Sequence, residues 1–315
     1  MNQSQCNLII IGGGPAGLTA GIYAARARLH VKLIEKLSPG GQVLNTDWVE
    51  NYPGFPKGVS GFELMDKMRE QAERFNLDIT YGEVTSLERK DDFIRVNLAE
   101  GEILARAVII ATGAQPHKLG VPGEEELTGK GVSYCATCDG PFYRDAEVLV
   151  VGGGDTAVEE ALFLTRFASR VHLCHRRDEL RATGILRERI MAEPKVQIHW
   201  STVVTAIEAD SSNQVSAAEI KDLKTGQTSK MPVQGVFMFV GTRPITDFLN
   251  GFVKLDGRGF VETDQELNTS QPGVWAAGDV RAKQLRQIVT AVGDGATAAF
   301  NAEKYIQDKL HARSG

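Results

Sequence analysis

The sequence predicts an α/β protein with two related strand–turn–helix units, and three observations lead to that class. A short apolar strand, a glycine turn and a helix of small residues follow one another in NLIIIGGGPAGLTAGIYAAR, residues 7–26. The same order returns in EVLVVGGGDTAVEEALFLTR, residues 147–166, and each copy leads into another apolar run. Strands that alternate with helices are typical of parallel sheets covered on both faces. The length of 315 residues, 42% of them hydrophobic, suits two such three-layer domains.

The charge balance and the amino terminus exclude several classes of function. The formal net charge is −5 and the sequence pI is about 5.8, whereas proteins that bind nucleic acids or membrane surfaces need a large basic field. No Lys or Arg precedes the first apolar run, and glycines interrupt it well before the ~20 residues of a membrane span. We therefore expect a cytoplasmic chain that begins at its own Met1, with no nucleic-acid or membrane partner.

The first glycine turn has the spacing of a dinucleotide-binding, or Rossmann-like, fingerprint. Gly12, Gly14 and Gly17 form G-x-G-x-x-G between the strand and the helix. The first glycine permits the tight turn, the second lets backbone approach a pyrophosphate, and the third lets helix and strand pack closely. The phosphates then lie at the positive end of the helix dipole. Glu35, at the end of the next strand, suits the ribose of an unphosphorylated adenosine, as in FAD or NAD.

The second glycine turn differs from the first in the residues that would contact the ribose. It has the form G-x-G-x-x-A, from Gly152, Gly154 and Ala157. The position equivalent to Glu35 is His175, and three arginines follow in HRRDELRA, namely Arg176, Arg177 and Arg181. Because guanidinium groups bind phosphate as charged forks, this turn suits the 2′-phosphate of NADPH. The alternative is a solvated basic start of a helix.

Two further strand ends favour a flavin at the first turn. RAVIIATGAQP is an apolar strand that ends in Ala111, Thr112 and Gly113, small residues that let the chain pass close to a cofactor. GVWAAGDV ends in Gly278 and Asp279, whose carboxylate can accept hydrogen bonds from ribityl hydroxyls. Taken alone, each segment would be a plain exit from a strand or an acidic turn.

Two of the four cysteines, Cys135 and Cys138, form a C-x-x-C motif, and Asp139 directly follows Cys138. By itself this spacing fits a redox disulfide, half of a zinc site or a pair of buried thiols. As a zinc site it supplies only two ligands, and the sequence offers no second pair at a suitable spacing.

The other candidate ligands do not predict a metal site either. His172, Cys174 and His175 share one expected strand, where neighbouring residues alternate faces. Four cysteines are also too few for a secreted disulfide framework. Cys6 and Cys174, far apart and beside apolar residues, are expected to be small buried side chains.

The order of these motifs resembles the bacterial low-molecular-weight thioredoxin reductases, flavoproteins of the pyridine nucleotide-disulfide oxidoreductase family. CATCDG stands shortly before the second glycine turn and HRRDELRA follows it. NYPGF, GTRP, GVWAAGDV and RQIVTAVGDGATAA extend the resemblance over essentially the whole chain. It implies an FAD domain of residues 1–116 and 245–315, an NADPH domain of residues 117–244 inserted in it, and a homodimer. ATGAQP and GTRP would be the two crossings.

The resemblance also implies cofactor contacts, motif by motif. On the FAD side these are Gly12, Gly14, Pro15, Ala16, Gly17, Glu35, Lys36, Gly40, Gly41, Gln42, Asn51, Ala111, Thr112, Gly113, Gly278, Asp279, Arg286, Gln287 and Ile288. On the NADPH side they are Gly152, Gly154, Asp155, Thr156, Ala157, His175, Arg176, Arg177, Arg181 and Gly241. It implies no metal ligand.

The activity implied by the resemblance is that of a thioredoxin-disulfide reductase in which Cys135 and Cys138 form a redox-active disulfide. A hydride passes from NADPH to the flavin. Cys138 would face the flavin, and Cys135 would attack the disulfide of thioredoxin through a mixed disulfide. Asp139 would move the thiol proton, and its alternative role is the amino-terminal cap of a helix. Rotation of the NADPH domain against the FAD domain would expose the disulfide to its two partners in turn.

Related families fit this sequence less well. Glutathione and lipoamide reductases carry C-x-x-x-x-C in the first helix of the FAD domain, and this chain does not. The flavoproteins of alkyl hydroperoxide reductase prefer NADH and usually carry an additional amino-terminal domain, whereas ferredoxin–NADP reductases on this scaffold lack the cysteine pair. Two other functions remain open, a flavin-dependent thiol redox sensor and the reductase component for a peroxiredoxin. The three arginines argue against the sensor, because a sensor reduced by other thiols needs no phosphate-selective site.

Overall fold

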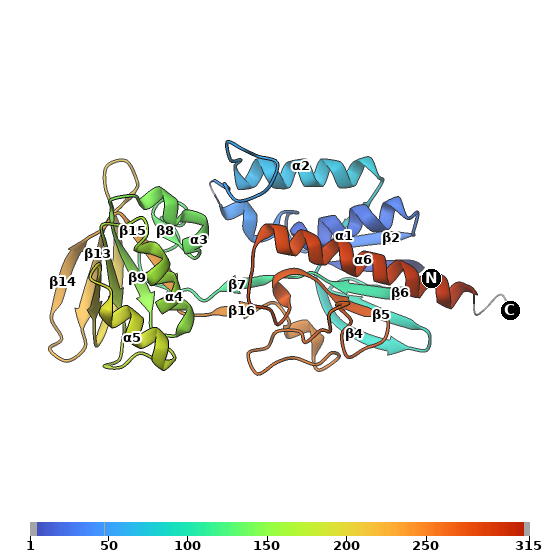
Figure 1. The fold of residues 1–315 in the computed structure, drawn as a ribbon. Coiled ribbons are helices and arrows are strands. Elements are labelled where there is room, and N and C mark those ends of the chain that lie inside the picture. The colour runs from blue at the N-terminus through green and yellow to red at the C-terminus, as the bar shows by residue number, and fades with distance from the viewer. Residues whose placement is uncertain (1–4, 47, 312–315) are drawn as a thin grey trace. The chain divides into compact units, whose positions relative to one another are not determined.

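The structure, a computed structural model, describes residues 5–46 and 48–311, apart from the side chain of Asn45. The chain divides into two compact units: unit 1 is Met1–Gln115 with Arg243–Gly315, and unit 2 is Pro116–Thr242. Unit 2 is therefore inserted in the sequence of unit 1. The two passages carry the short strands β7 (Ala114–Pro116) and β16 (Thr242–Pro244), which pair with each other (Figure 1).

Unit 1 is built on a seven-stranded sheet that begins with four parallel strands in the order β3-β2-β1-β6. These strands are β1 (Gln5–Ile11), β2 (Val31–Glu35), β3 (Asp78–Tyr81) and β6 (Glu102–Ile110). The antiparallel strands β5 (Phe93–Leu98) and β4 (Val84–Lys90) continue the sheet, and β17 (Val274–Ala276) runs parallel to the carboxyl end of β6. The helices are α1 (Pro15–Arg26), α2 (Gly61–Arg74) and α6 (Ile288–His311), with short 3-10 turns η1 (Gly41–Asn45), η3 (Asp247–Leu249) and η4 (Gly278–Val280).

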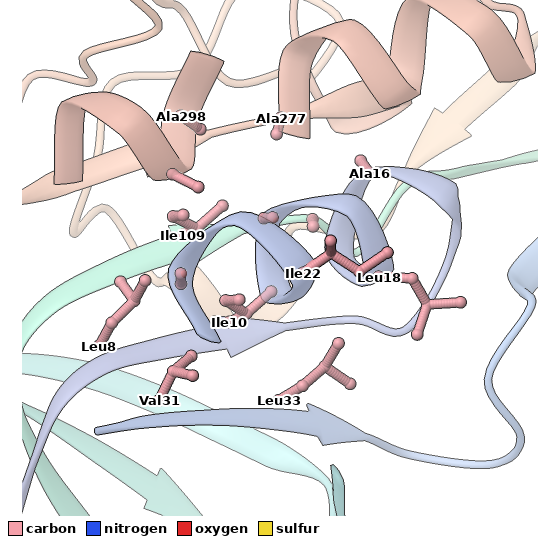
Figure 2. Packing of buried hydrophobic residues seen from close by; sticks show 14 of the residues in the cluster. Leu8, Ile10, Ala16, Leu18, Ile22, Val31, Leu33, Ile109, Ala277 and Ala298 are labelled. Carbon is pink, nitrogen blue, oxygen red and sulfur yellow. The ribbon is translucent and has the colours of Figure 1, made fainter. Parts of the chain in front are cut away.

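The alternation of side chains along β1 gives unit 1 a core on both faces of its sheet. Leu8 and Ile10 pack under α1 with residues of β2, β6 and α6, whereas Ile9 and Ile11 belong to the core on the opposite face (Figure 2). All four are at most 4% exposed. Burying such a side chain stabilises the fold by roughly 1.5–3 kcal/mol, so this strand anchors the turn that follows it.

The small residues of α1 allow unusually close packing against α6. A Cβ added at Gly295 of α6 would lie 2.2 Å from the backbone oxygen of Ala16, so only glycine permits the two helices to approach at this point. One consequence is that α6, at Gly295, lies beside the amino-terminal turn of α1. The segments around Gly14 and Gly278, far apart in the sequence, are brought together in the same way, since a Cβ at Gly278 would lie 2.9 Å from that of Ala16.

Unit 2 repeats this plan with a five-stranded parallel sheet in the order β11-β10-β9-β15-β8. Its strands are β8 (Val132–Ser133), β9 (Glu147–Gly152), β10 (Arg170–Cys174), β11 (Val196–His199) and β15 (Gly235–Phe239). A separate antiparallel sheet contains β12 (Thr202–Ala209), β13 (Val215–Asp222) and β14 (Thr228–Pro232). The helices are α3 (Ala136–Asp139), α4 (Asp155–Leu164) and α5 (Gly184–Ala192), and η2 (Gly140–Tyr143) is a 3-10 turn.

The predicted α/β class and both predicted strand–turn–helix units are confirmed. Each glycine turn joins a buried parallel strand to a helix, β1 to α1 and β9 to α4. Cys6 and Cys174 are both free and buried, as the sequence predicted. Within the described residues, no helix combines the length and apolar character that crossing a membrane requires.

Candidate functional site

The first glycine turn is shaped so that two of its glycines are required by the fold and one faces open space. Gly12 has φ +104°, and a Cβ there would lie 2.5 Å from the backbone oxygen of Ala111. A Cβ at Gly17 would lie 1.8 Å from the oxygen of Gly12. Among the described residues, no atom lies within 4 Å of the Cβ position of Gly14, directly before α1. The free N–H groups at the start of α1 are thus open to an anionic ligand.

Glu35 is fixed to this turn by two backbone N–H groups. Its Oε2 accepts a hydrogen bond from the N–H of Gly13 at 2.6 Å, and its Oε1 accepts one from Leu37 at 2.9 Å. The carboxylate therefore stays beside the turn at the end of β2. The neighbouring Lys36, also predicted as a contact, is exposed and forms an ion pair with Glu83 at 2.8 Å.

Two of the predicted flavin contacts that are distant in the sequence, Gly40 and Gly41, lie against this turn. A Cβ at Gly41 would lie 3.4 Å from the Cα of Gly14, and the N–H of Gly40 donates to the oxygen of Gly13 at 2.8 Å. Asn51 donates from Nδ2 to Oε1 of Gln287 at 3.0 Å, directly before α6 begins at Ile288. Gln42 is exposed in η1, and Pro15 is the first residue of α1.

The strand end at 111–113 lies on the other side of the same turn. Ala111 is in contact with the Gly12 position, as described above. The Thr112 hydroxyl donates to the oxygen of Ile245 at 2.7 Å, and Gly113 has φ +72°. This segment therefore leaves the sheet at the carboxyl end of β6, next to the glycine turn.

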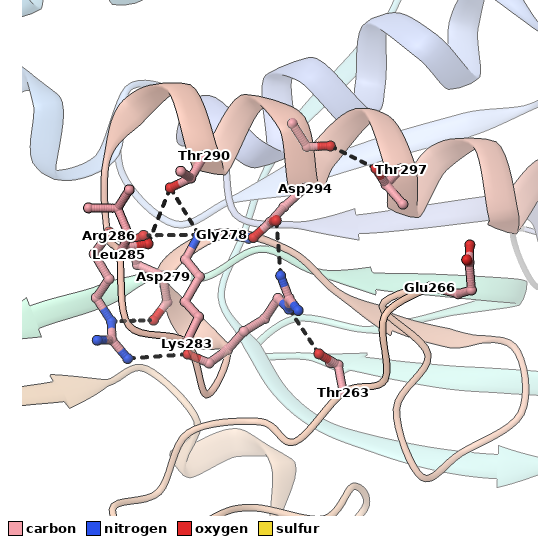
Figure 3. Close-up of polar contacts among 12 residues, drawn as sticks. Thr263, Glu266, Gly278, Asp279, Lys283, Leu285, Arg286, Thr290, Asp294 and Thr297 are labelled. Atoms are coloured by element: carbon pink, nitrogen blue, oxygen red, sulfur yellow. Dashed lines mark hydrogen bonds and ion pairs between the residues drawn. The ribbon is translucent and has the colours of Figure 1, made fainter. Parts of the chain in front are cut away.

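Asp279 follows Gly278, which lies against Ala16 of α1, and has a buried oxygen that no described residue hydrogen-bonds. Its Oδ1 has no hydrogen-bond partner within the described part of the chain. Burial raises the pKa of Asp279, against the opposing effects of Lys283 and Arg286. Arg286 lies over the ring of Phe260 at 4.2 Å. It also donates from Nε to the backbone oxygen of Asp279 at 3.4 Å (Figure 3). Burial also lowers the pKa of Arg286.

Sequence reasoning missed three charged residues in this region. Arg281, Lys283 and Asp294 form ion pairs, with their side chains at most 16% exposed. Arg281 and Lys283 follow Asp279 closely, and Asp294 belongs to the RQIVTAVGDGATAA segment. These three charged residues lie in segments that also contain predicted contacts, and this clustering could have identified them. The spacing of the three residues, however, matches no simple motif.

The second glycine turn has the same steric logic in unit 2. Gly152 has φ +155°, and a Cβ there would lie 2.5 Å from the oxygen of Phe239 and 2.6 Å from the Cβ of Ala157. In the part of the chain that the structure describes, nothing lies within 4 Å of the Cβ position of Gly154, directly before α4. Asp155 accepts a hydrogen bond on Oδ1 from the N–H of Thr183 at 2.7 Å, and Thr156 is exposed.

His175 is buried against this turn and does not face solvent. Its ring packs on Gly153, where an added Cβ would lie 2.2 Å from Nδ1, and its Nε2 lies 3.1 Å from the oxygen of Glu179. Burial is the main cause that lowers the pKa of His175, and Arg181 and Arg177 lower it further. The imidazole is therefore neutral at pH 7.

The three arginines lie on the exposed loop next to the turn. Arg176, Arg177 and Arg181 are exposed, and within the described residues none of them forms an ion pair with a carboxylate. The N–H of Arg181 donates to the oxygen of Gly153 at 2.7 Å, which ties this loop to the turn. Gly241, predicted as a further contact, has φ +124° and accepts a hydrogen bond from the N–H of His117 at 2.9 Å.

Cys135 and Cys138 form a disulfide in unit 2, with S–S 2.15 Å and Cα atoms 5.3 Å apart. Cys135 is the amino-terminal cap of α3, and its Sγ accepts a hydrogen bond from the N–H of Cys138 at 3.2 Å. After reduction, the same N–H would stabilise a thiolate at Cys135. The described residues contain no group of three or more potential ligands placed to hold a metal ion.

Asp139 does not have the capping role considered from the sequence. It is the last residue of α3 and precedes η2, but its side chain makes no capping hydrogen bond there. Its Oδ2 instead accepts a hydrogen bond from the buried Ser133 hydroxyl at 2.5 Å. Burial, and secondarily the charge of Asp139, raises the pKa of Tyr143 to about 12, so that phenol stays protonated near the carboxylate.

Comparisons with known proteins point in one direction. Residues 6–295 match the family described as pyridine nucleotide-disulphide oxidoreductase. A protein named thioredoxin reductase from Listeria monocytogenes is 48% identical over 302 residues, which cover 96% of this chain and 94% of the relative. One from Treponema pallidum is 45% identical, with coverages of 96% and 98%. The crystal structure of thioredoxin reductase from Streptococcus pyogenes is 48% identical, covers 98% of this chain and 100% of its own, and superposes with a TM-score of 0.94.

Proposed function

Because this chain belongs to the thioredoxin reductases of the pyridine nucleotide-disulphide oxidoreductase family, we propose that it reduces the disulfide of thioredoxin with electrons that pass from NADPH through FAD to Cys135 and Cys138. The disulfide inside a C-x-x-C, in a unit that also contains a glycine turn with exposed arginines beside it, is the observation that carries this proposal. The sensor and the peroxiredoxin-linked alternatives are not supported, since the similar proteins carry the name thioredoxin reductase.

The first glycine turn and its neighbours fit FAD. The open approach to Gly14 suits a diphosphate. The buried Oδ1 of Asp279, which no described residue hydrogen-bonds, suits a hydroxyl donor of the cofactor. FAD would be held by Gly12, Gly14, Pro15, Ala16, Gly17, Glu35, Lys36, Gly40, Gly41, Gln42, Asn51, Ala111, Thr112, Gly113, Gly278, Asp279, Arg286, Gln287 and Ile288. When bound, FAD supplies a carrier that takes two electrons as a hydride and passes them to a disulfide.

The second glycine turn and its arginines fit NADPH. Arg176, Arg177 and Arg181 present cations that no carboxylate of the described residues pairs with, beside a turn whose Gly154 position is open. His175 would act by holding the turn in place, because its neutral ring is buried against Gly153. NADPH would be held by these residues together with Gly152, Asp155, Thr156, Ala157 and Gly241.

The cysteine pair would carry the electrons to the protein substrate. Two electrons break the Cys135–Cys138 bond, and one proton converts Cys138 to a thiol while Cys135 stays a thiolate. The Cys135 thiolate then attacks one sulfur of the thioredoxin disulfide, which releases the other sulfur as a thiolate. Attack by Cys138 on the mixed disulfide restores the starting disulfide and releases reduced thioredoxin. Asp139, next in sequence to Cys138 and bonded to Ser133, would supply and remove the thiol proton.

Steady-state turnover tests the function directly. Purified protein reconstituted with FAD should oxidise NADPH in the presence of thioredoxin, and should do so much faster than it oxidises NADH. Cys138→Ser should trap thioredoxin on Cys135 as a mixed disulfide, whereas Cys135→Ser should not. A colourless protein after reconstitution, or full turnover in either serine variant, would contradict the proposal. We also propose that the protein is cytoplasmic and that it forms a homodimer. Sedimentation of the purified protein tests the homodimer.

A further inference from the structure

A buried ion network lies next to Asp279 in unit 1. It joins Arg281, Lys283 and Asp294, whose side chains are 13%, 12% and 16% exposed. Charges removed from water in this way are costly unless they are fully paired, so this network is expected to have one arrangement. Asp294 lies on α6, and the two cations lie on the segment that connects η4 to α6.

Asp294 is the centre of this network because it accepts from three donors. Its Oδ2 accepts from the N–H of Gly278 at 3.0 Å and from Nζ of Lys283 at 2.9 Å, and its Oδ1 pairs with Nη1 of Arg281 at 2.9 Å (Figure 3). Gly278 has φ +78° and opens the turn that carries Asp279. The carboxylate on α6 therefore fixes both the turn at Gly278 and the direction of a lysine.

The direction of Lys283 leaves one oxygen of Asp279 open. Its Nζ is bonded to Asp294 and lies 3.3 Å from Oγ1 of Thr290. The distance from Nζ to Oδ1 of Asp279 is 3.7 Å, which is too long for a hydrogen bond but close enough for the charges to attract. Asp279 thus gains a compensating cation while its buried Oδ1 has no hydrogen-bond partner within the described residues.

We propose that Asp294 is a positioning residue for the flavin cofactor, which fixes the Gly278 turn and holds Lys283 away from Asp279 so that Oδ1 stays free to accept a hydroxyl of FAD. This inference rests on the proposed binding of FAD. It adds to that proposal a residue on α6 that need not touch the cofactor. Without Asp294, Lys283 would turn to the nearest carboxylate, Asp279, and close the acceptor.

The alternative to positioning is a simple effect of charge, and it predicts the opposite result. FAD carries a negatively charged diphosphate, so removing the negative charge of Asp294 would make the region more positive and tighten binding. Under the positioning inference the same change weakens binding, because the acceptor is lost. The sign of the change in affinity therefore separates the two explanations.

The test is the affinity of the FAD-free protein for FAD, measured by the quenching of flavin fluorescence. Asp294→Asn should weaken binding at least about tenfold, the size expected when one hydrogen bond to a charged group is lost. The matched control is Asn301→Ala on the same helix, which removes a bond at 2.9 Å to the backbone oxygen of Glu266 and should leave the affinity within about twofold. Unchanged or tighter binding by Asp294→Asn, or an equal loss in Asn301→Ala, would overturn the inference.

A second pair of variants covers the case in which Asp294→Asn folds poorly. Lys283→Met leaves the bonds of Asp294 to Gly278 and Arg281, and should also weaken FAD binding, because Asp279 loses its compensating cation. The double variant Asp294→Asn/Lys283→Met should bind FAD better than Asp294→Asn alone, since no lysine remains to cover Asp279. A double variant as weak as or weaker than Asp294→Asn, or unchanged binding by Lys283→Met, contradicts positioning. Wild-type protein that binds no FAD would instead refute the proposed function.

Discussion

The Ser133 hydroxyl donates a hydrogen bond to the Asp139 carboxylate, with 2.5 Å between Oγ and Oδ2. Oγ of Ser133 also accepts a hydrogen bond from the N–H of Cys135 at 3.1 Å. Ser133 lies in β8, the edge strand of the parallel sheet in unit 2, and is 4% exposed. One buried hydroxyl thus connects the proposed acid to the cysteine that would attack thioredoxin.

This connection predicts that Ser133→Ala lowers kcat for thioredoxin reduction. Loss of one hydrogen bond to a charged group corresponds to a decrease in kcat of roughly ten- to a hundredfold. Stopped-flow measurement of the step that reduces thioredoxin provides the value. Ser133→Thr keeps the hydroxyl and should restore most of the rate.

Two controls separate this effect from a general loss of stability. Thr205→Val also removes a hydroxyl that donates to a carboxylate, Glu219 at 2.6 Å, but in the three-stranded sheet, and should leave kcat unchanged. In an Asp139→Asn background, Ser133→Ala should have little further effect, because the partner is already altered. If Ser133→Ala lowered kcat by the same factor in the wild-type and Asp139→Asn backgrounds, Ser133 would not act through Asp139.

Coenzyme preference should depend on the exposed arginines of unit 2. Arg176→Ala/Arg177→Ala should lower kcat/KM for NADPH about a hundredfold, about tenfold for each lost guanidinium, and leave kcat/KM for NADH nearly unchanged. Steady-state assays with both coenzymes give the ratio. Arg189→Ala, an exposed arginine on α5, serves as the matched control. Equal losses with both coenzymes would remove these arginines from 2′-phosphate recognition.

Two glycines of the first turn should separate folding from cofactor binding. Gly17→Ala places a Cβ 1.8 Å from the oxygen of Gly12, so the turn and α1 must move apart. Overpacking of this kind costs about 1–3 kcal/mol, and we expect a fall of several degrees in the thermal midpoint of the FAD-free protein. Gly14→Ala places its Cβ in open space, at φ −72°, and should keep that midpoint while weakening FAD binding. A lower thermal midpoint of FAD-free Gly14→Ala would mean that Gly14 is needed for folding and not only for binding FAD.

The sequence predicted the parts of this protein whose geometry is local. A glycine turn between a strand and a helix, or two cysteines three residues apart, is set by neighbours in the chain. Gly12, Gly17 and Gly152 were predicted for this reason, and each meets the backbone clash that the fingerprint implies.

The features that sequence reasoning missed depend on which distant segments meet. Asp294 reaches Gly278 only because α6 packs closely on α1. Ser133 carried no motif of its own, although it is six residues from Asp139. His175 was predicted from its position in the repeat, but the repeat cannot reveal that its ring lies under Gly153. Tertiary packing therefore decides the partners of these residues.

Buried histidines in unit 2 should make the protein less stable below neutral pH. Burial lowers the pKa of His175 and, together with His172, that of His199, from an ordinary value of 6.5. The unfolded chain therefore binds more protons than the folded protein as the pH falls through and below that value. Each histidine then removes up to about 1.4 kcal/mol of stability per pH unit until its folded pKa is reached. We expect the thermal midpoint to fall between pH 7.5 and 5.5.

The contact between His172 and His199 allows this prediction to be assigned to particular rings. Nδ1 of His172 lies 3.1 Å from Nε2 of His199, and Nε2 of His172 lies 3.0 Å from Oε2 of Glu147. Protonating both rings would place two cations side by side, so His199→Gln should flatten the fall in midpoint on the acid side. His30→Gln, at an exposed position in unit 1, should retain the full slope. Asp178 and Asp222 have pKa values lowered from 3.8 by hydrogen bonds, so their titration lies below this window and cannot produce the slope. An identical pH dependence in wild type and His199→Gln would show that this pair does not control it.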